Sequence, residues 1–330
     1  MANDTAGGVV GREQHGPPHH RLSPAQVLAI GFVGLIVAGT LLLELPVSAE
    51  PGHRLSLVDA FFSATSAVCV TGLIVVDTPT VLSAFGEAVL LVLIQAGGLG
   101  YMTLSATLVV ALGKRLTLRE RAALQEGLNV QSRAGLVKFL LTVVKVSLLV
   151  EAAGAVVLTL WWWRQYDLGH AAWLGAFHAV SAFNNAGFSL FPDNLVRYRG
   201  DLVVNLVITG LIIAGGLGFF VLREVWALAG QVWRREHEVG GLARLLGHVT
   251  LHTRLALVLT VVLLGTSFVA FLGLEWTNPR TLGPLPWHES VLAAWFAAVT
   301  PRTAGFNTID VGGMTVPAVF LTIVLMFIGA

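Results

Sequence analysis

Three short glycine-containing strings in this chain could bind a cation through their backbone carbonyls. They read SATSAVCVTGL, HAVSAFNNAGF and FAAVTPRTAGF, and their glycines Gly72, Gly187 and Gly305 are separated by 115 and 118 residues. Glycine tolerates backbone angles that other residues avoid, so such a string can turn its carbonyl oxygens toward one point. Rings of carbonyls that replace the hydration shell of an ion are how some channels select cations.

The surroundings of the three glycines repeat as well. Ten residues before each stands a large aromatic residue, eight before stands an alanine, and one after stands leucine or phenylalanine. An isolated membrane glycine usually serves helix packing or a tight turn. A threefold register is not expected from packing alone, and it predicts that the strings are equivalent parts of one filter.

The composition indicates that the strings lie in a membrane protein. Of the 330 residues, 55% are hydrophobic and 12% are charged, against about 25% charged in soluble domains. This excludes a soluble globular enzyme and a disordered protein. The net charge of +1 gives no reason to expect nucleic-acid binding, and the single cysteine, Cys69, excludes an intramolecular disulfide framework.

The apolar pattern predicts membrane-spanning helices that alternate with shorter segments. The spanning candidates are 27–45, 79–112, 136–163, 201–222, 255–276 and 315–330. The segments 56–73, 171–190 and 289–308 are too short to span, and each ends in a glycine string. We therefore expect these short segments to enter the membrane and return.

The helices that follow the strings carry a second repeated motif. IQAGGLG, with Gly97 and Gly98, matches IAGGLG, with Gly215 and Gly216, and Gly329 lies at a similar distance after the third string. Small residues let helices approach closely. Helix packing is therefore favoured over a gating role for these glycines, and both interpretations stay open.

These features predict an all-α integral membrane protein of helix–pore loop–helix units around a pseudo-fourfold axis, with three of four repeats present. The predicted units are a disordered cytoplasmic tail (1–24), repeat 1 with its basic loop (25–135), repeat 2 (136–254), and repeat 3, cut within its second helix (255–330). Because a ring of four strings is expected, we predict that the chain is C-terminally truncated and that three repeats alone cannot close a pore.

Lysine and arginine are concentrated in the tail and in the loops 113–135 and 223–254. The positive-inside rule places these segments in the cytoplasm and makes the protein a multi-pass plasma-membrane protein with a cytoplasmic N-terminus. The opposite side carries more acids than bases, which gives a mildly cation-attracting outer face. These acids include Asp59, Asp77, Asp193, Glu289 and Asp310.

The strings SATSAVCVTGL, FNNAGF and PRTAGFNT, with GGLG-containing second helices, resemble the filter segments of the Trk/Ktr/HKT superfamily of potassium transport proteins. The resemblance covers residues 25–330 and is strongest to the KtrB branch. It implies a filter lined by backbone carbonyls. The implied residues are Val70, Thr71, Gly72, Asn185, Ala186, Gly187, Thr303, Ala304 and Gly305.

The resemblance also implies how the protein works. Glycine at the filter position accompanies potassium in this superfamily, so we expect potassium uptake through the filter, controlled by a glycine-rich gate. A homodimer of pore subunits on a cytoplasmic ring of nucleotide-binding regulatory subunits is implied, with potassium as the ion bound at the filter and no organic cofactor on this chain. The two basic loops are candidate docking surfaces for that ring. No bond-making chemistry is expected, so the protein is not an enzyme.

Two alternatives remain. A sodium-selective or sodium–potassium cotransporting member of the same superfamily is favoured if the fourth filter position holds serine. An intramembrane enzyme would need convergent acid–base residues, and the candidates His178, Glu151 and Glu87 are scattered along the sequence. The sequence assigns no role to these residues or to Lys145, although ionisable groups within membrane helices are often functional.

Overall fold

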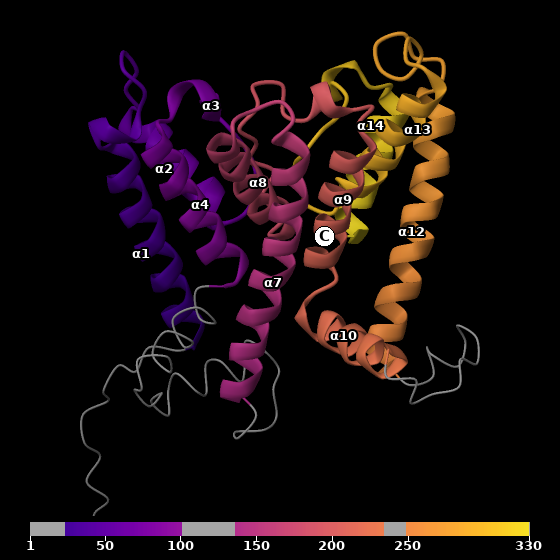
Figure 1. Cartoon of the computed structure of the whole chain (residues 1–330), viewed down its shortest axis with the longest axis horizontal. Helices are drawn as coiled ribbons and strands as arrows, with labels where there is room; N and C mark the ends of the chain where they lie inside the picture. The colour runs from indigo at the N-terminus through magenta and orange to yellow at the C-terminus, as the bar shows by residue number, and fades with distance from the viewer. Residues whose placement is uncertain (1–23, 101–135, 234–248, 330) are drawn as a thin grey trace, which may run out of the picture.

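The computed structural model of the chain describes residues 24–100, 136–233 and 249–329, and the regular elements in these ranges are helices (Figure 1). An isolated antiparallel bridge joins Ala49 to Leu82. The predicted all-helical class is therefore confirmed, whereas the number of repeats in the whole protein stays a prediction. The predicted tail lies outside the described residues except for Pro24.

The described helices repeat one order three times: a long helix, a short helix, a glycine string and a further helix. They are α1 (Pro24–Glu44), α2 (Leu57–Val68) and α4 (Ala84–Gly98), then α7 (Leu136–Trp162), α8 (Leu168–Phe183) and α9 (Leu202–Gly216), then α12 (Leu251–Glu275), α13 (Trp287–Val299) and α14 (Val316–Gly329). Two further helices are α3 (Thr78–Val81) and α10 (Phe219–Trp233). The short helices α2, α8 and α13 lie in the upper half of Figure 1.

Local chemistry sets where the short helices begin and what they pack against. The Ser56 hydroxyl accepts a hydrogen bond from the Asp59 backbone N–H at the start of α2 (3.1 Å), and the Asp167 carboxylate accepts one from His170 N–H at the start of α8 (3.0 Å). Such side chains satisfy N–H groups that have no partner inside the helix. Buried small residues such as Ala179 then let α8 pack closely against α7 and α9.

The predicted spans 79–112 and 201–222 are wrong as continuous helices. The helix α4 ends at Gly98 and α9 ends at Gly216, where α10 follows at an angle of 110°. The cause is the left-handed backbone of Gly100 (φ 74°) and Gly218 (φ 78°), which ends a helix at low cost because glycine has no Cβ. Residues 101–112 of the first predicted span lie outside the described residues.

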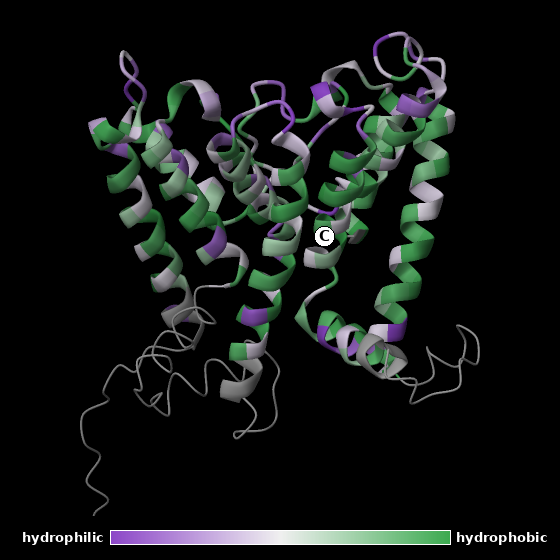
Figure 2. Ribbon diagram, in the orientation of Figure 1, coloured by the Kyte–Doolittle hydropathy of each residue, from purple (hydrophilic) through white to green (hydrophobic). Residues whose placement is uncertain are grey.

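Among the described helices, Leu141–Trp162 and Leu251–Glu275 are long and apolar enough to cross a membrane, and the bent pair α9 and α10 could form a third span. Their exposed faces are apolar. Along α12, for example, Val261 is 70% exposed and Val269 is 67% exposed, and Figure 2 shows a largely hydrophobic ribbon there. Such surface would be costly in water, so it suits lipid contact.

Glu275 ties the end of α12 to the start of α14. It is fully buried, and its carboxylate accepts hydrogen bonds from Asn278 Nδ2 (2.6 Å), Thr281 Oγ1 (2.5 Å), Thr315 N–H (2.8 Å) and Thr315 Oγ1 (2.6 Å). The sequence did not point to this cluster, because its members are up to 40 residues apart.

Replacing Glu275 with leucine is expected to lower the free energy of unfolding by about 3–5 kcal/mol, because it leaves several buried donors without an acceptor. Thermal or denaturant unfolding of the purified protein in detergent measures this. Glu289→Gln is the matched control, since it removes only the partly exposed contact between Glu289 and Arg199 (3.0 Å), for which less than about 1 kcal/mol is expected. Equal destabilisation by both variants would contradict the assignment of Glu275 as the residue that holds α12 and α14 together.

Candidate functional site

The three glycine strings share one rare backbone conformation. Gly72, Gly187 and Gly305 have φ angles of 72°, 72° and 74°, and the residues two positions earlier have φ angles of 54°, 56° and 60°. Those earlier residues are Val70, Asn185 and Thr303. A left-handed conformation is uncommon for a non-glycine residue and is most strained for β-branched ones. Its presence at matching positions indicates that the strings are built alike.

The carbonyls of the strings are largely free of hydrogen bonds. In each string a residue with negative φ lies between the two left-handed positions. In the described chain, the nine predicted filter residues have almost no carbonyl hydrogen bonds. The exception is Gly187 O, which accepts a long one (3.5 Å) from Asn194 Nδ2. Unpaired carbonyl oxygens of this kind are available to a ligand.

The fold brings the three strings into contact. A Cβ added to Gly72 would lie 2.5 Å from the carbonyl oxygen of Ala186, and one added to Gly187 would lie 2.7 Å from that of Ala304. A Cβ on Gly305 would lie 3.1 Å from the Cα of Gly187 and 3.8 Å from that of Gly72. The second string thus lies between the first and the third, and side chains are excluded where they meet.

Hydrogen bonds from the ends of the short helices fix the path of the strings. The middle residues Thr71, Ala186 and Ala304 each donate their backbone N–H to the preceding short helix or its C-cap residue, at 2.9, 2.7 and 3.0 Å. Hydroxyl groups near the helix ends then hold the outgoing chain. Ser181 Oγ donates to Phe188 O (2.8 Å), and Thr300 Oγ1 donates to Phe306 O (2.5 Å).

The glycines of the second motif contact the ends of the short helices. A Cβ on Gly97 would overlap the carbonyl of Val68, and one on Gly215 would overlap that of Phe183. Val68 and Phe183 each lie four residues before their string glycine. These glycines therefore allow the string and the second helix to approach, while a gating role for them stays a prediction.

The other glycines of this motif have different surroundings. A Cβ on Gly98 would overlap Asn184 Oδ1, and one on Gly216 would lie 3.4 Å from Asn185 Nδ2. Gly329 is the last residue of α14. Of the five glycines predicted for gating or packing, Gly97, Gly98 and Gly215 therefore lie directly against atoms at or beside the strings.

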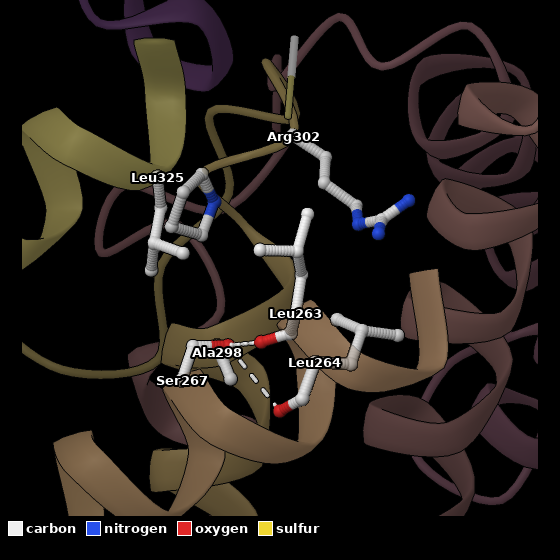
Figure 3. Close-up of a pocket in the computed structure, with 7 residues that line it drawn as sticks. Leu263, Leu264, Ser267, Ala298, Arg302 and Leu325 are labelled. Atoms are coloured by element: carbon white, nitrogen blue, oxygen red, sulfur yellow. Dashed lines mark hydrogen bonds between the residues drawn. The ribbon is translucent and has the colours of Figure 1, made fainter. Parts of the chain in front are cut away.

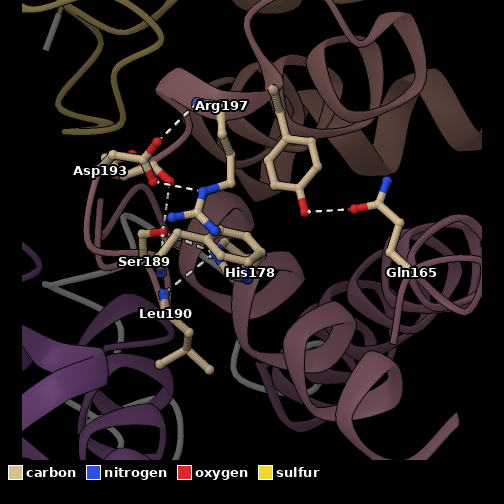
Figure 4. Close-up of polar contacts among 9 residues, drawn as sticks. Gln165, His178, Ser189, Leu190, Asp193 and Arg197 are labelled. Atoms are coloured by element: carbon tan, nitrogen blue, oxygen red, sulfur yellow. Dashed lines mark hydrogen bonds and ion pairs between the residues drawn. The ribbon is translucent and has the colours of Figure 1, made fainter. Parts of the chain in front are cut away.

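The structure holds the ionisable candidates apart. His178 is fully buried, with Nδ1 2.8 Å from Leu174 O and Nε2 3.0 Å from Ser189 Oγ (Figure 4). Glu87 accepts a hydrogen bond from Trp173 Nε1 (2.6 Å). Such separate structural contacts do not form the convergent acid–base group that an intramembrane enzyme needs. Among the described residues, no group of three or more His, Cys, Asp or Glu side chains could hold a metal ion.

Arg302 lies within the third string, directly before its first predicted filter residue, Thr303. It lines a small cavity of about 10 Å³ with Leu263, Leu264 and Leu325 (Figure 3). The described chain shows no ion pair of Arg302, and the acid that follows the string, Asp310, accepts a hydrogen bond from Gly312 N–H (3.0 Å).

Sequence reasoning missed Asn194, which connects the second and third strings. Its Oδ1 accepts from Asn307 N–H (3.3 Å), and the backbone N–H of Leu195 donates to Asn307 O (3.1 Å). Asn194 has a left-handed backbone (φ 55°). Asparagine after aspartate in the polar string FPDNL is a signal for such a turn, because its short side chain tolerates this conformation.

A cavity of about 290 Å³ adjoins two of the strings. Its lining includes the string glycines Gly72 and Gly187 and three aspartates, Asp77, Asp193 and Asp310. Each aspartate follows its string glycine by five or six residues. Asp193 also pairs with Arg197 (2.7 Å); burial lowers the pKa of Arg197, but its contacts with Asp193 and Tyr166 together raise it by more.

The sequence matches the TrkH family, described as cation transport proteins, over residues 16–330. The Ktr system potassium uptake protein B of Bacillus subtilis is 44% identical over 94% of this chain and 66% of its own length. The protein of that name from Vibrio alginolyticus is 39% identical over 92% and 64%. Potassium/sodium uptake protein NtpJ of Enterococcus hirae is 36% identical over 94% and 65%. The chain therefore spans just under two thirds of the length of these relatives.

The fold also matches a solved structure. The crystal structure of the potassium transporter TrkH from Vibrio parahaemolyticus superposes with a TM-score of 0.62 over 94% of this chain and 57% of that chain, at 19% identity. At this identity the match shows a shared fold alone. Together with the sequence match, it confirms the resemblance on which the filter assignment was based.

Proposed function

The chain belongs to the TrkH family of cation transport proteins, and from this premise we propose that it carries potassium ions into the cell through its three converging glycine strings. The family is one of transporters rather than enzymes. The observation that carries the proposal is the contact between three strings of matching left-handed backbone whose carbonyls are almost free of hydrogen bonds.

In this proposal the strings replace the water around the ion. An ion that leaves its hydration shell needs oxygen atoms at similar distances to offset the loss. The carbonyls of the nine filter residues supply them on three sides, and a fourth string supplies the remaining side. The ion is then released toward the basic side, where a glycine-rich gate below the filter controls its passage.

The proposal includes the partners that the resemblance implies. The pore subunit forms a homodimer in the plasma membrane, with its N-terminus in the cytoplasm, and a ring of nucleotide-binding subunits docks on its basic side. The candidate docking loop 113–135 and residues 234–248 of the loop 223–254 lie outside the described residues. What supports this arrangement is the relationship to the Ktr system proteins.

A second candidate is sodium transport or combined sodium and potassium transport. One relative at 36% identity is named a potassium/sodium uptake protein, and this favours keeping the alternative. The three glycines at the filter positions favour potassium, since the resemblance links glycine there to potassium.

Potassium-dependent growth tests the proposal. The intact protein is produced in a host that lacks its own potassium uptake, and growth is followed at low external potassium, with and without added sodium. We expect rescue of growth and uptake of potassium. Uptake of sodium without potassium would favour the second candidate, and the lack of uptake of either ion by a protein present in the membrane would refute both.

The three aspartates of the cavity are expected to raise the local cation concentration. Replacing Asp77, Asp193 and Asp310 together with asparagine should raise the potassium concentration for half-maximal uptake about threefold at low ionic strength, and less at physiological salt, because the charges are screened. Initial uptake rates over a potassium series measure this. The single variant Asp193→Asn should have an effect comparable to that of the other single variants, since it changes the net charge by the same amount and leaves Arg197 without its ion pair.

The control for this prediction is Asp59→Asn. Asp59 lies at the start of α2, accepts a hydrogen bond from Ser56 Oγ (2.7 Å) and does not line the cavity. An equal rise in half-maximal concentration for this control, or a triple-variant effect that does not depend on salt, would show that the aspartates do not act through their charge.

A further inference from the structure

We propose that Glu151 is a positioning residue that holds the second glycine string in the register needed for ion selectivity, a role that rests on the proposed function. Glu151 lies on α7, and it touches no filter residue in the described contacts. It acts through Asn184, the C-cap residue of α8, which directly precedes Asn185, the first predicted filter residue of the second string.

Glu151 belongs to a hydrogen-bond network of three side chains, which come from α4, α7 and the end of α8. Glu151 Oε1 accepts hydrogen bonds from Gln95 Nε2 on α4 (3.1 Å) and from Asn184 Nδ2 (3.1 Å). Asn184 Nδ2 also lies 3.2 Å from Gln95 Oε1 and 2.9 Å from Val180 O. The network therefore connects α4 and α7 to the second string.

The position of Glu151 makes a purely packing role costly. Its side chain is 4% exposed within a long apolar helix, where a carboxyl group is expensive and an apolar residue would pack at less cost. The described chain gives it no ion pair. Lys145, the nearest basic residue earlier on α7, is exposed. The hydrogen bonds from the side-chain amides of Gln95 and Asn184 are therefore what offsets the cost of burying its carboxylate.

The geometry of Asn184 connects this network to the filter. Its amide rests against Gly98, where a Cβ would overlap Oδ1, so the side chain has little freedom to shift. The next residue, Asn185, begins the left-handed pattern of the string. The equivalent positions in the other two described strings hold Cys69, which is exposed, and Arg302, so among the described strings only the second has this asparagine anchor.

The second string contacts both of the other described strings. It contacts the first string through Ala186 and the third through Gly187. A shift at the start of this string would change its distance to the first string and to the third string at the same time. Because selectivity depends on the placement of carbonyls around the ion, loss of the anchor should reduce discrimination between ions more than it reduces the amount of folded protein.

The test compares potassium and sodium uptake by the intact protein in cells, at matched membrane abundance. Glu151→Ala is expected to lower the potassium-over-sodium selectivity about tenfold, since Gln95 Nε2 loses its acceptor and Asn184 Nδ2 loses the one that ties it to α7. Glu151→Gln should keep selectivity within about twofold, because its Oε1 still accepts both hydrogen bonds. Asn184→Ala should match Glu151→Ala, and the double variant should be no worse than either.

The control is Glu87→Ala, which removes another carboxyl contact between α4 and α8, the hydrogen bond to Trp173 at the far end of α8. It should leave selectivity unchanged. Equal loss in this control, or wild-type selectivity in Asn184→Ala, would overturn the inference, even if Glu151→Ala itself fails to fold. Failure of the proposed function is distinguishable, because the unmodified protein would then show no potassium uptake.

Discussion

Gly187→Ser is expected to reduce potassium uptake at low external potassium by about 100-fold or more. The added Cβ would lie 2.7 Å from Ala304 O and 2.8 Å from the Cα of Gly305, both backbone atoms that cannot rotate away. The left-handed φ of 72° adds about 1–2 kcal/mol of strain for any residue with a Cβ. If the steric overlap and the backbone strain together cost about 3 kcal/mol, the uptake rate falls by about two orders of magnitude.

The three strings should differ in a defined order. Gly72→Ser should be comparable to Gly187→Ser, because its Cβ would lie 2.5 Å from Ala186 O. Gly305→Ser should be milder, since its nearest neighbour would be 3.1 Å away. Initial uptake rates at equal membrane abundance measure the order. The control is Gly210→Ser on α9, where nothing lies within 4 Å of a Cβ, and a control as impaired as Gly187→Ser would contradict the prediction.

Gly215→Ala is expected to destabilise the fold rather than to alter ion selectivity. Its Cβ would overlap the carbonyl of Phe183, so α9 and the end of α8 would have to separate. Overpacking of this kind costs roughly 2–3 kcal/mol. Gly97→Ala should behave alike, because its Cβ would overlap the carbonyl of Val68.

Thermal unfolding and the yield of folded protein in detergent measure this effect. Gly265→Ala on α12 is the control, since a Cβ there meets nothing within 4 Å, and alanine favours a helix over glycine by about 1 kcal/mol. A Gly215→Ala protein that is as stable as this control but transports ions without restraint would instead assign the glycine to a gate.

The convergence of the strings could be predicted from the sequence, because the signals for it are local. Gly72, Gly187 and Gly305 each stand at the same distance from an aromatic residue and an alanine, and the left-handed backbone at each one is a property of glycine itself. The chemical identity of the conducted ion stays a proposal, as do the dimer, the regulatory ring and the unit boundaries.

The breaks after α4 and α9 could not be predicted from hydropathy. Residues 79–112 and 201–222 remain apolar past Gly98 and Gly216, whereas the break depends on the backbone angles of Gly100 and Gly218. The hydrogen-bond partners of Glu151 could not be predicted from the sequence for another reason. Gln95 and Asn184 are 56 and 33 residues away, so only the packed helices bring them to the carboxylate.

The most direct test of the filter is ion flux through the intact purified protein in lipid vesicles, measured for potassium and sodium with the unmodified strings and with Gly72→Ser, Gly187→Ser and Gly305→Ser. Potassium flux should exceed sodium flux, and each serine variant should lose flux or selectivity, with Gly305→Ser the least affected. Potassium selectivity that survives all three substitutions unchanged would contradict the assignment of the three strings as the filter.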